Sequence, residues 1–132
     1  LYALDNAAGL TGADLSRALL QVDELRRRME MFFDDYDLLL TPTMAVPAFP
    51  VDQRPTEIAG RKVETFWGYL PFTYPINMTG QTASSVPCGF SSDGMPIGLH
   101  IIGPRGAEAK VLQASAAFEA AQPWEDKRAP LV

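Results

Sequence analysis

The sequence predicts an α/β protein in which the strands of a sheet are flanked by two long helices. Three features predict this class. Apolar residues recur at helical spacing in two well-separated segments, a short continuous apolar run follows the first segment, and an Asp-Gly turn joins two further apolar runs. A helix that leads directly into such a strand is typical of a layered α/β architecture, and 132 residues are enough for one domain with a core.

The first predicted helix spans residues 12–35. Thr11 and Asp14 have the spacing of a capping box, an N-cap hydroxyl followed three residues later by a carboxylate. Glu24 and Arg28 are four residues apart, the spacing of an ion pair along one helix face. The apolar residues that recur at helical spacing are Leu15, Leu19, Val22, Leu25, Met29, Phe32 and Phe33.

A strand is predicted over residues 37–41, because this apolar run is continuous and ends at a proline, the pattern of a strand covered on both faces. Residues 42–71 carry several prolines and scattered aromatics with little periodicity, so we expect a long loop of the kind that forms lids or pocket walls. Residues 72–80 predict a short helix, since Pro75 is tolerated in a first turn and Gly80 suits the position after the last turn.

A hairpin of two strands is predicted over residues 84–103, with Asp93-Gly94 in its turn. A second amphipathic helix is predicted over residues 107–122, an alanine-rich segment that a proline ends. Its predicted packing face consists of Val111, Leu112, Ser115 and Phe118.

The composition and charge exclude several classes of function. A formal net charge of −5 argues against nucleic-acid binding, which needs a basic face to neutralise phosphates. No apolar run approaches the roughly 18 residues that a membrane span needs, and we expect no secretory signal from the first residues. The single cysteine, Cys88, permits no internal disulfide, so we expect a reducing, cytoplasmic compartment.

The titratable and nucleophilic side chains show no spacing that predicts a catalytic or metal-binding cluster. His100 lies in a predicted apolar strand, so we interpret it as structural rather than as a metal ligand or general base. Cys88 has no basic neighbour in the sequence to activate it, and we expect a buried, inert thiol. Lys62 and Lys110 lie in polar surroundings, whereas a lysine that acts as a base must be desolvated. We expect no metal and no cofactor.

Residues 72–106 carry two closely spaced motifs, F-T-Y-P-x-N-x-T-G-Q-x-A-x-S-V-P-C-G-F and then D-G-x-P-x-G-L-x-I-I-G-P-R-G. This run resembles the C-terminal portion of the amidase signature family, the Ser-Ser-Lys amide hydrolases. The resemblance extends back to the D-L-L-L-T-P-T segment over residues 37–43 and forward to Trp124. It therefore covers almost all of the chain, and residues 1–132 are similar to a C-terminal fragment of a single amidase domain.

The resemblance implies a large α/β/α fold around a mixed sheet, and acyl transfer from an amide to a serine. In the family a second serine and a lysine move the proton, and backbone amides stabilise the oxyanion. None of these catalytic residues maps onto this sequence, because the family's serines lie in a Gly-Ser-Ser-Gly loop. Ser84 and Ser85 instead precede Val86-Pro87 in a strand, and we interpret both as structural. The chain departs from the family's usual residues at Thr82, often proline, and at His100, often glutamine.

The resemblance also gives candidate substrate-binding residues and a substrate class. Trp67, Tyr74 and Asn77 are the candidates for pocket walls; the alternative is that the aromatic rings pack in the core. The glutamine-transamidating branch of the family usually carries a carboxylate just ahead of the Thr-x-Pro-x-Asn segment, and residues 67–72 contain none. This favours an amidase that hydrolyses a small, less polar amide to an acid and ammonia or an amine.

Two other functions stay open at this point. One is the glutaminase subunit of a glutamine-dependent tRNA amidotransferase, and the other is a non-catalytic binding or assembly module. A fragment that lacks the catalytic residues is expected to be inactive alone. Strands taken from a larger sheet also leave unpaired edges and apolar faces, so we expect a homo-oligomer.

Overall fold

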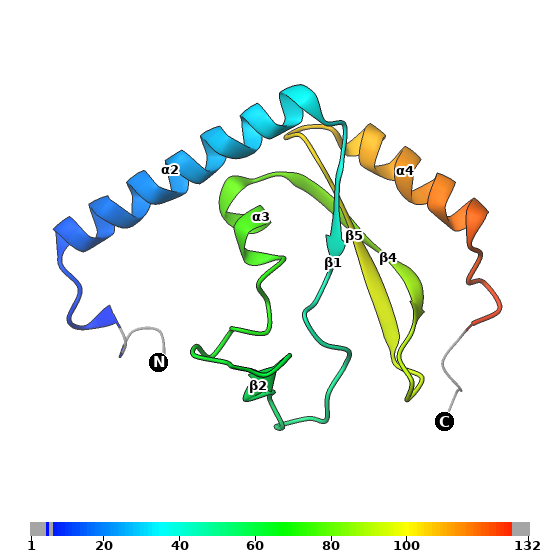
Figure 1. The fold of residues 1–132 in the computed structure, drawn as a ribbon. Coiled ribbons are helices and arrows are strands. Elements are labelled where there is room, and N and C mark those ends of the chain that lie inside the picture. The colour runs from blue at the N-terminus through cyan, green and yellow to red at the C-terminus, as the bar shows by residue number, and fades with distance from the viewer. Residues whose placement is uncertain (1–4, 6, 128–132) are drawn as a thin grey trace.

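The computed structural model describes residues 5 and 7–127. Its main sheet has three strands that pair antiparallel in the order β1-β5-β4. In Figure 1 the long helices α2 and α4 extend to opposite sides from one end of this sheet, and the short helix α3 lies beneath α2. The elements are α2 (Gly12–Asp35), β1 (Leu39–Pro42), β2 (Glu57–Ile58), β3 (Arg61–Lys62), α3 (Tyr74–Thr79), β4 (Thr82–Phe90), β5 (Pro96–Gly103) and α4 (Glu108–Ala121).

The predicted α/β class, with sheet strands flanked by two long helices, is confirmed. The pairings among the described strands are all antiparallel, so the parallel pairing that a mixed sheet also contains does not occur among them. Within the part of the chain that the structure describes, no helix combines the length and apolar character that crossing a membrane requires.

Helix α2 has the predicted bounds, and local hydrogen bonds set its start. The Thr11 hydroxyl accepts from the Asp14 N–H at 3.2 Å, and the Asp14 carboxylate accepts from the Thr11 N–H at 2.9 Å. The predicted pair of Glu24 and Arg28 forms at 2.8 Å. The helix ends at Asp35, and the next residue, Tyr36, has an extended backbone with φ −126°. The capping box therefore forms as the sequence predicts.

The predicted hairpin is present, with its first strand starting two residues earlier, at Thr82. Ser85 lies opposite His100, and a bulge between Pro87 and Gly89 shifts the register. Gly94 occupies the turn with φ 83°, a conformation that favours glycine. The second strand, β5, is central because it pairs with β4 on one side and β1 on the other.

The main apolar cluster forms where α4 packs on β4 and β5. Val111 of α4 is 2% exposed, as is Ile101 of β5. Leu112, which the sequence places on the same face, is 65% exposed, so that prediction is wrong. Successive helical residues are about 100° apart, and only one of two adjacent apolar residues can point at the sheet. The cluster contains Val86, Ile101 and Val111, surrounded by Leu38, Leu99, Ala114, Phe118 and Trp124.

Strand β1 differs from its prediction in position and in burial. It starts at Leu39 rather than residue 37, and Leu40 is 56% exposed. The prediction of a strand covered on both faces is therefore wrong for the described chain. The physical reason is that Leu40 lies opposite Ile101 on the face of the sheet that α4 covers, but α4 packs mainly on β4 and β5 and leaves the edge strand β1 open. An apolar run shows that a strand can be covered, not that it is.

The predicted loop over residues 42–71 contains a small two-stranded ribbon that was not predicted. In it Glu57 pairs with Lys62, and Ile58 pairs with Arg61. Ala59 and Gly60 form the turn with φ values of 50° and 74°. Two adjacent positive φ values are typical of a two-residue hairpin turn, which Asn-Gly or Asp-Gly usually signals. Ala-Gly is a weaker sequence signal for this turn, so the ribbon was not predicted.

Helix α3 lies within its predicted range, and both of its predicted end signals are confirmed. Pro75 occupies the first turn, and Gly80 follows the last turn in the left-handed conformation with φ 73°. The Gly80 N–H donates to the Ile76 carbonyl, so the turn after the helix is closed by a hydrogen bond. Ile76 and Thr79 are buried and anchor the helix.

Candidate functional site

The three predicted pocket-wall residues lie on and just before α3. Tyr74 and Asn77 are one helical turn apart, and Trp67 is in the preceding loop. Trp67 is 45% exposed and Tyr74 is 39% exposed, so the alternative of aromatic rings packed in the core does not describe them. Their exposure leaves them free to contact a ligand or another segment, and their role in substrate binding stays a prediction.

Trp67 belongs to an aromatic cluster within the long loop. Its ring centroid lies 4.7 Å from that of Phe66 in an edge-to-face arrangement and 6.2 Å from that of Tyr69. The Arg54 guanidinium lies 3.4 Å from the centroid of Phe66, which is the geometry of a cation–π contact. The sequence did not single out Arg54, because nothing local predicts which ring an arginine will cover.

A row of polar side chains crosses one face of the sheet beside the loop. The hydroxyls of Thr43 and Ser85 are 2.7 Å apart, and the Thr41 hydroxyl is 3.5 Å from Nδ1 of His100. His100 is 6% exposed, and burial lowers its pKa, so the imidazole is neutral at neutral pH. The hydrogen-bond contact and the burial agree with the structural role predicted for this histidine.

Gly98 makes the close approach of these hydroxyls possible. A Cβ atom there would lie 2.6 Å from Oγ of Ser85 and 2.7 Å from Oγ1 of Thr43. The Thr43 N–H also donates to the Gly98 carbonyl at 2.9 Å. The start of the long loop is thereby fixed against β4 and β5.

Ser84 and Ser85 have separate partners on opposite faces of β4. The Ser84 hydroxyl is 2.8 Å from the Ser115 hydroxyl of α4, whereas the Ser85 hydroxyl meets Thr43. Neighbouring residues in a strand point to opposite faces, so the two serines cannot act on one substrate atom. This arrangement agrees with the structural interpretation of both serines.

Cys88 differs from its prediction of a buried thiol. It is only partly buried, and its Sγ is 3.4 Å from the Ile97 carbonyl oxygen. The reason is the bulge near the end of β4, an edge strand, which leaves the thiol beside a shallow apolar groove of about 280 Å³. Nothing in the described surroundings supplies a base.

The two candidate lysines both lie at the surface, as expected. The Lys62 side chain is on β3, opposite Glu57. Nζ of Lys110 is 2.6 Å from Oδ1 of Asp37, and this contact lowers the pKa of the Asp37 carboxyl. The exposed position of Lys110 and its carboxylate partner agree with the interpretation of this lysine as a solvated side chain.

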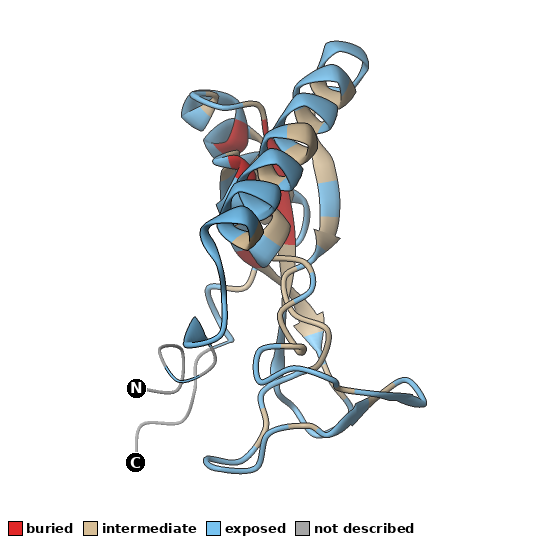
Figure 2. Ribbon diagram, turned by 90° about the vertical axis from the view of Figure 1, so that its left-hand side faces the viewer, coloured by how far each residue is buried: buried red, intermediate tan, exposed pale blue. Residues whose placement is uncertain are grey.

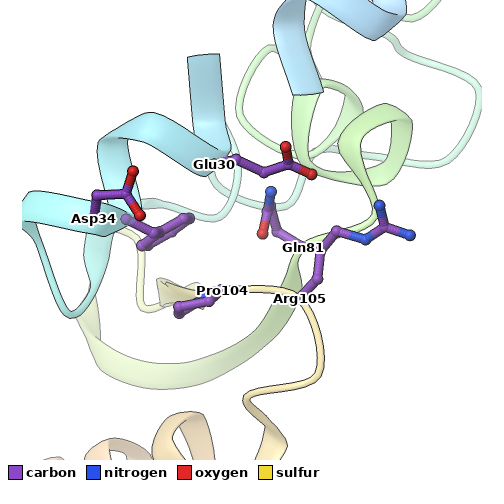
Figure 3. A pocket seen from close by; sticks show the side chains of 6 residues that line it. Glu30, Asp34, Gln81, Pro104 and Arg105 are labelled. Carbon is purple, nitrogen blue, oxygen red and sulfur yellow. The ribbon is translucent and has the colours of Figure 1, made fainter. Parts of the chain in front are cut away.

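An open cavity of about 260 Å³ lies where α2 meets the turn before β4 and the loop after β5. Figure 3 shows the Gln81 side chain between those of Asp34 and Arg105, with Glu30 above it. Both amide atoms of Gln81 are buried, and neither has a hydrogen-bond partner among the described residues. We refer to this site as the Gln81 pocket; it is lined by Glu30, Phe33, Asp34, Gln81, Pro104 and Arg105.

The Gln81 pocket was not predicted from the sequence, although one signal was present. Glu30 and Asp34 are four residues apart on a helix, so two like charges lie on one face. The other members come from segments far away in the chain, and only the fold brings them together. Among residues 5 and 7–127, no group of three His, Cys, Asp or Glu side chains could hold a metal ion.

The Amidase family model matches residues 4–112 of this chain. The chain is 39% identical over 127 residues to an acylamidase of Rhodococcus erythropolis, covering 95% of this chain and 26% of that protein. It is 41% identical over 130 residues to a glutamyl-tRNA(Gln) amidotransferase subunit of Moorella thermoacetica, covering 98% of this chain and 25% of that protein. The chain thus spans about a quarter of the length of these curated relatives.

Solved structures of amidase signature enzymes have a similar fold over nearly the whole of this chain. A bacterial aryl acylamidase of the amidase signature family superposes with a TM-score of 0.82 at 35% identity, over 96% of this chain and 28% of that one. The corresponding glutamyl-tRNA(Gln) amidotransferase subunit of Thermotoga maritima superposes with a TM-score of 0.61 at 27% identity, over 98% of this chain and 32% of that one.

Proposed function

The chain belongs to the amidase signature family, and from that premise we propose that it is the C-terminal part of an amidase, which we call the parent protein. The parent protein hydrolyses a small carboxylic amide to an acid and ammonia or an amine. The single observation that carries this proposal is the family match over residues 4–112, in a chain that covers only 26% of a 39% identical acylamidase.

The proposed chemistry is a Ser-Ser-Lys acyl transfer. A serine hydroxyl is a weak nucleophile, so the reaction needs a base that is neutral near pH 7 and donors that stabilise the oxyanion. The candidate groups within this chain are otherwise engaged: Ser84 pairs with Ser115, and Lys110 pairs with Asp37. These contacts support a division in which other parts of the parent protein supply the catalytic residues and this chain is inactive alone.

The role proposed for this chain is to form part of the scaffold and of the substrate pocket. The contact of Thr43 with Ser85 and Gly98 fixes the start of the long loop on the sheet. Tyr74 and Asn77 lie on α3, which the buried residues Ile76 and Thr79 anchor, and Trp67 lies in the loop that leads to this helix. We propose these three side chains as walls of the substrate pocket.

A general amidase is favoured over an amidotransferase subunit by two observations. The superposition on the aryl acylamidase is closer than that on the amidotransferase subunit, with TM-scores of 0.82 and 0.61. Residues 67–72 also contain no carboxylate that could bind the ammonium group of glutamine. The amidotransferase subunit stays the second candidate, because the Moorella protein is 41% identical over 130 residues.

The test is to clone the reading frame that contains this chain and to assay its product beside the isolated chain. Three substrates separate the candidates: 4-nitroacetanilide, propionamide and glutamine. We expect the parent protein to hydrolyse one of the first two and the isolated chain to hydrolyse none. Release of ammonia from glutamine alone would favour the amidotransferase subunit. Hydrolysis by the isolated chain would contradict the proposed division, and an inactive parent protein would favour a binding or assembly module.

We also propose that the isolated chain associates with itself. β1 and β4 are the edge strands of the described sheet, and α2 exposes several large apolar side chains. Unpaired strand edges and uncovered apolar faces both promote association. Light scattering should give a mass above that of one chain, and a monodisperse monomer would contradict this proposal.

A further inference from the structure

The long loop before α3 is closed on itself by side chains from its two halves. The guanidinium carbon of Arg54 lies 3.4 Å from the ring centroid of Phe66 and 5.5 Å from that of Trp67. Phe49 meets Tyr69 edge to face, with the ring centroids 5.3 Å apart. The ribbon of β2 and β3 lies between these halves in the sequence, so both contacts join segments that the ribbon separates. We refer to these five side chains as the loop clip.

Arg54 is held in the loop clip by a different kind of contact from the arginines at the surface of α2. Those arginines pair with carboxylates, as Arg17 does with Asp14 at 2.9 Å. The Arg54 guanidinium lies over aromatic rings, where its charge is attracted to the ring faces. Phe66 and Trp67 also contact each other edge to face at 4.7 Å. Arg54 and Phe66 together therefore restrict the orientation of the Trp67 ring.

Trp67 stays exposed although its ring is held in this way. Its side chain is 45% exposed, and that of Phe66 is 37% exposed. A ring whose orientation is already fixed loses little conformational freedom when a ligand stacks on it, so more of the contact energy contributes to affinity. Aromatic rings stack on one another with centroids about 4.5–7 Å apart. An aryl group of a substrate can make this contact with Trp67, whereas an alkyl amide has no ring to stack.

We propose that the loop clip makes the parent protein selective for amides that carry an aryl group. Trp67 contacts the aryl group of the substrate, and Arg54 is a positioning residue that holds Trp67 for this contact. The inference deepens the proposed function and rests on it, because Trp67 is one of the pocket walls proposed there. The contact is made in the bound substrate and kept in the transition state, so it acts on KM rather than on kcat.

The first experiment measures KM and kcat of the parent protein for 4-nitroacetanilide, an aryl amide, and for propionamide, an alkyl amide. Trp67→Leu removes the indole ring and keeps an apolar side chain. We expect it to raise KM for 4-nitroacetanilide by about 2- to 10-fold, the size of one aromatic contact, and to leave KM for propionamide and both kcat values nearly unchanged. An equal change for both substrates would overturn the proposal, and so would no change for either.

The second experiment tests the positioning role of Arg54. Arg54→Met keeps an unbranched stem and removes the planar cation, and it should raise KM for 4-nitroacetanilide alone by about 2- to 5-fold. In the Trp67→Leu background it should cause no further rise, because Arg54 acts through Trp67. Arg61→Met, at an exposed position of β3 in the same loop, is the matched control and should leave both KM values unchanged. Additive effects in the double variant, or an equal effect of Arg61→Met, would overturn the positioning role.

A binding measurement keeps this inference separable from hydrolysis. 4-Nitroaniline carries the aryl group of 4-nitroacetanilide, and equilibrium dialysis against the parent protein should show about 2- to 10-fold weaker binding to Trp67→Leu than to the wild type. An inactive parent protein with this difference would overturn the proposed function and leave the aryl selectivity standing. An active parent protein without this difference would overturn the selectivity and leave the proposed function standing. Hydrolysis of propionamide without hydrolysis of 4-nitroacetanilide would do the same.

Discussion

Large apolar side chains occur both in the layer formed by β5 and α4 and in the N-terminal half of α2, yet they end in opposite environments. Ile101 and Val111 are each 2% exposed, whereas Leu15 is 62% and Leu19 is 56% exposed. Figure 2 shows the contrast, with buried residues gathered on the inner elements and α2 largely pale blue. An amphipathic pattern therefore predicts a helix face that can pack against another element. The face is buried only where such an element is present in the folded chain.

The two regions are also stabilised by different interactions. The sheet layer relies on burial, since apolar surface removed from water is the main favourable contribution to folding. Helix α2 has a capping box and exposed ion pairs, and it packs on α3, where Nε of Arg26 donates to the Met78 carbonyl at 3.1 Å. Substitutions in the two regions should therefore differ in size and in kind.

The largest difference is expected between Ile101→Ala and Leu19→Ala. Ile101→Ala opens a cavity in the core and should lower the free energy of unfolding by about 2–5 kcal/mol. At protein concentrations too low for the proposed self-association, Leu19→Ala removes an exposed side chain and should change the free energy of unfolding by less than about 0.5 kcal/mol. Urea unfolding of the two variants at several protein concentrations measures this. A large loss for Leu19→Ala that persists at the lowest concentration would contradict the contrast, whereas a loss that appears only at higher concentration would agree with self-association through α2.

The next effect concerns the packing of the long loop on the sheet. Gly98→Ala forces a Cβ atom into the hydroxyls of Ser85 and Thr43, and overpacking of this kind costs about 1–3 kcal/mol. Ser85→Ala in the same chain should recover part of the loss. Gly12→Ala serves as the control, because nothing lies within 4 Å of a Cβ there. Equal denaturation midpoints for Gly98→Ala and Gly12→Ala would show that the contact is not formed in solution.

A smaller effect is expected at the start of α2. Thr11→Ala removes the capping hydroxyl and should lower the stability of the helix by about 1 kcal/mol. The far-ultraviolet circular dichroism signal should melt at a lower temperature, while the near-ultraviolet signal, to which Trp124 beside the core contributes, is affected less. Thr56→Ala, in the exposed loop, is the control. If Thr56→Ala lowers the melting temperature equally, the capping box does not act in solution.

The smallest effect is electrostatic and depends on pH. Hydrogen bonds from Arg27 and Arg28 lower the pKa of Glu24 from 4.5 to about 2. A carboxyl whose pKa is depressed on folding contributes stability above its unfolded pKa, and that contribution is lost as the pH falls from 4.5 towards 2. At low salt, the helicity of Glu24→Gln should fall less between pH 4.5 and about 2 than that of the unsubstituted chain, whereas Glu119→Gln should fall as much as the unsubstituted chain. Identical acid titrations of the two variants would contradict the prediction.

The sequence by itself determined the features that depend on neighbouring residues. The start of α2 follows from Thr11 and Asp14, and the ends of α3 follow from Pro75 and Gly80, because caps and turns are local geometries. The hairpin turn at Asp93-Gly94 was predictable for the same reason. The capacity for burial along both long helices was likewise visible in the spacing of apolar residues.

Only the tertiary structure decided which of these apolar faces are buried against another element and which polar groups contact each other. It put Val111 rather than Leu112 against the sheet, placed β1 at an edge, and paired Lys110 with Asp37 across 73 positions of sequence. The Gln81 pocket arose in the same way, from segments that no local pattern connects. The physical reason is that local geometry is fixed by short-range sterics and hydrogen bonds. Burial and long-range pairing instead depend on which distant segments the folded chain brings into contact.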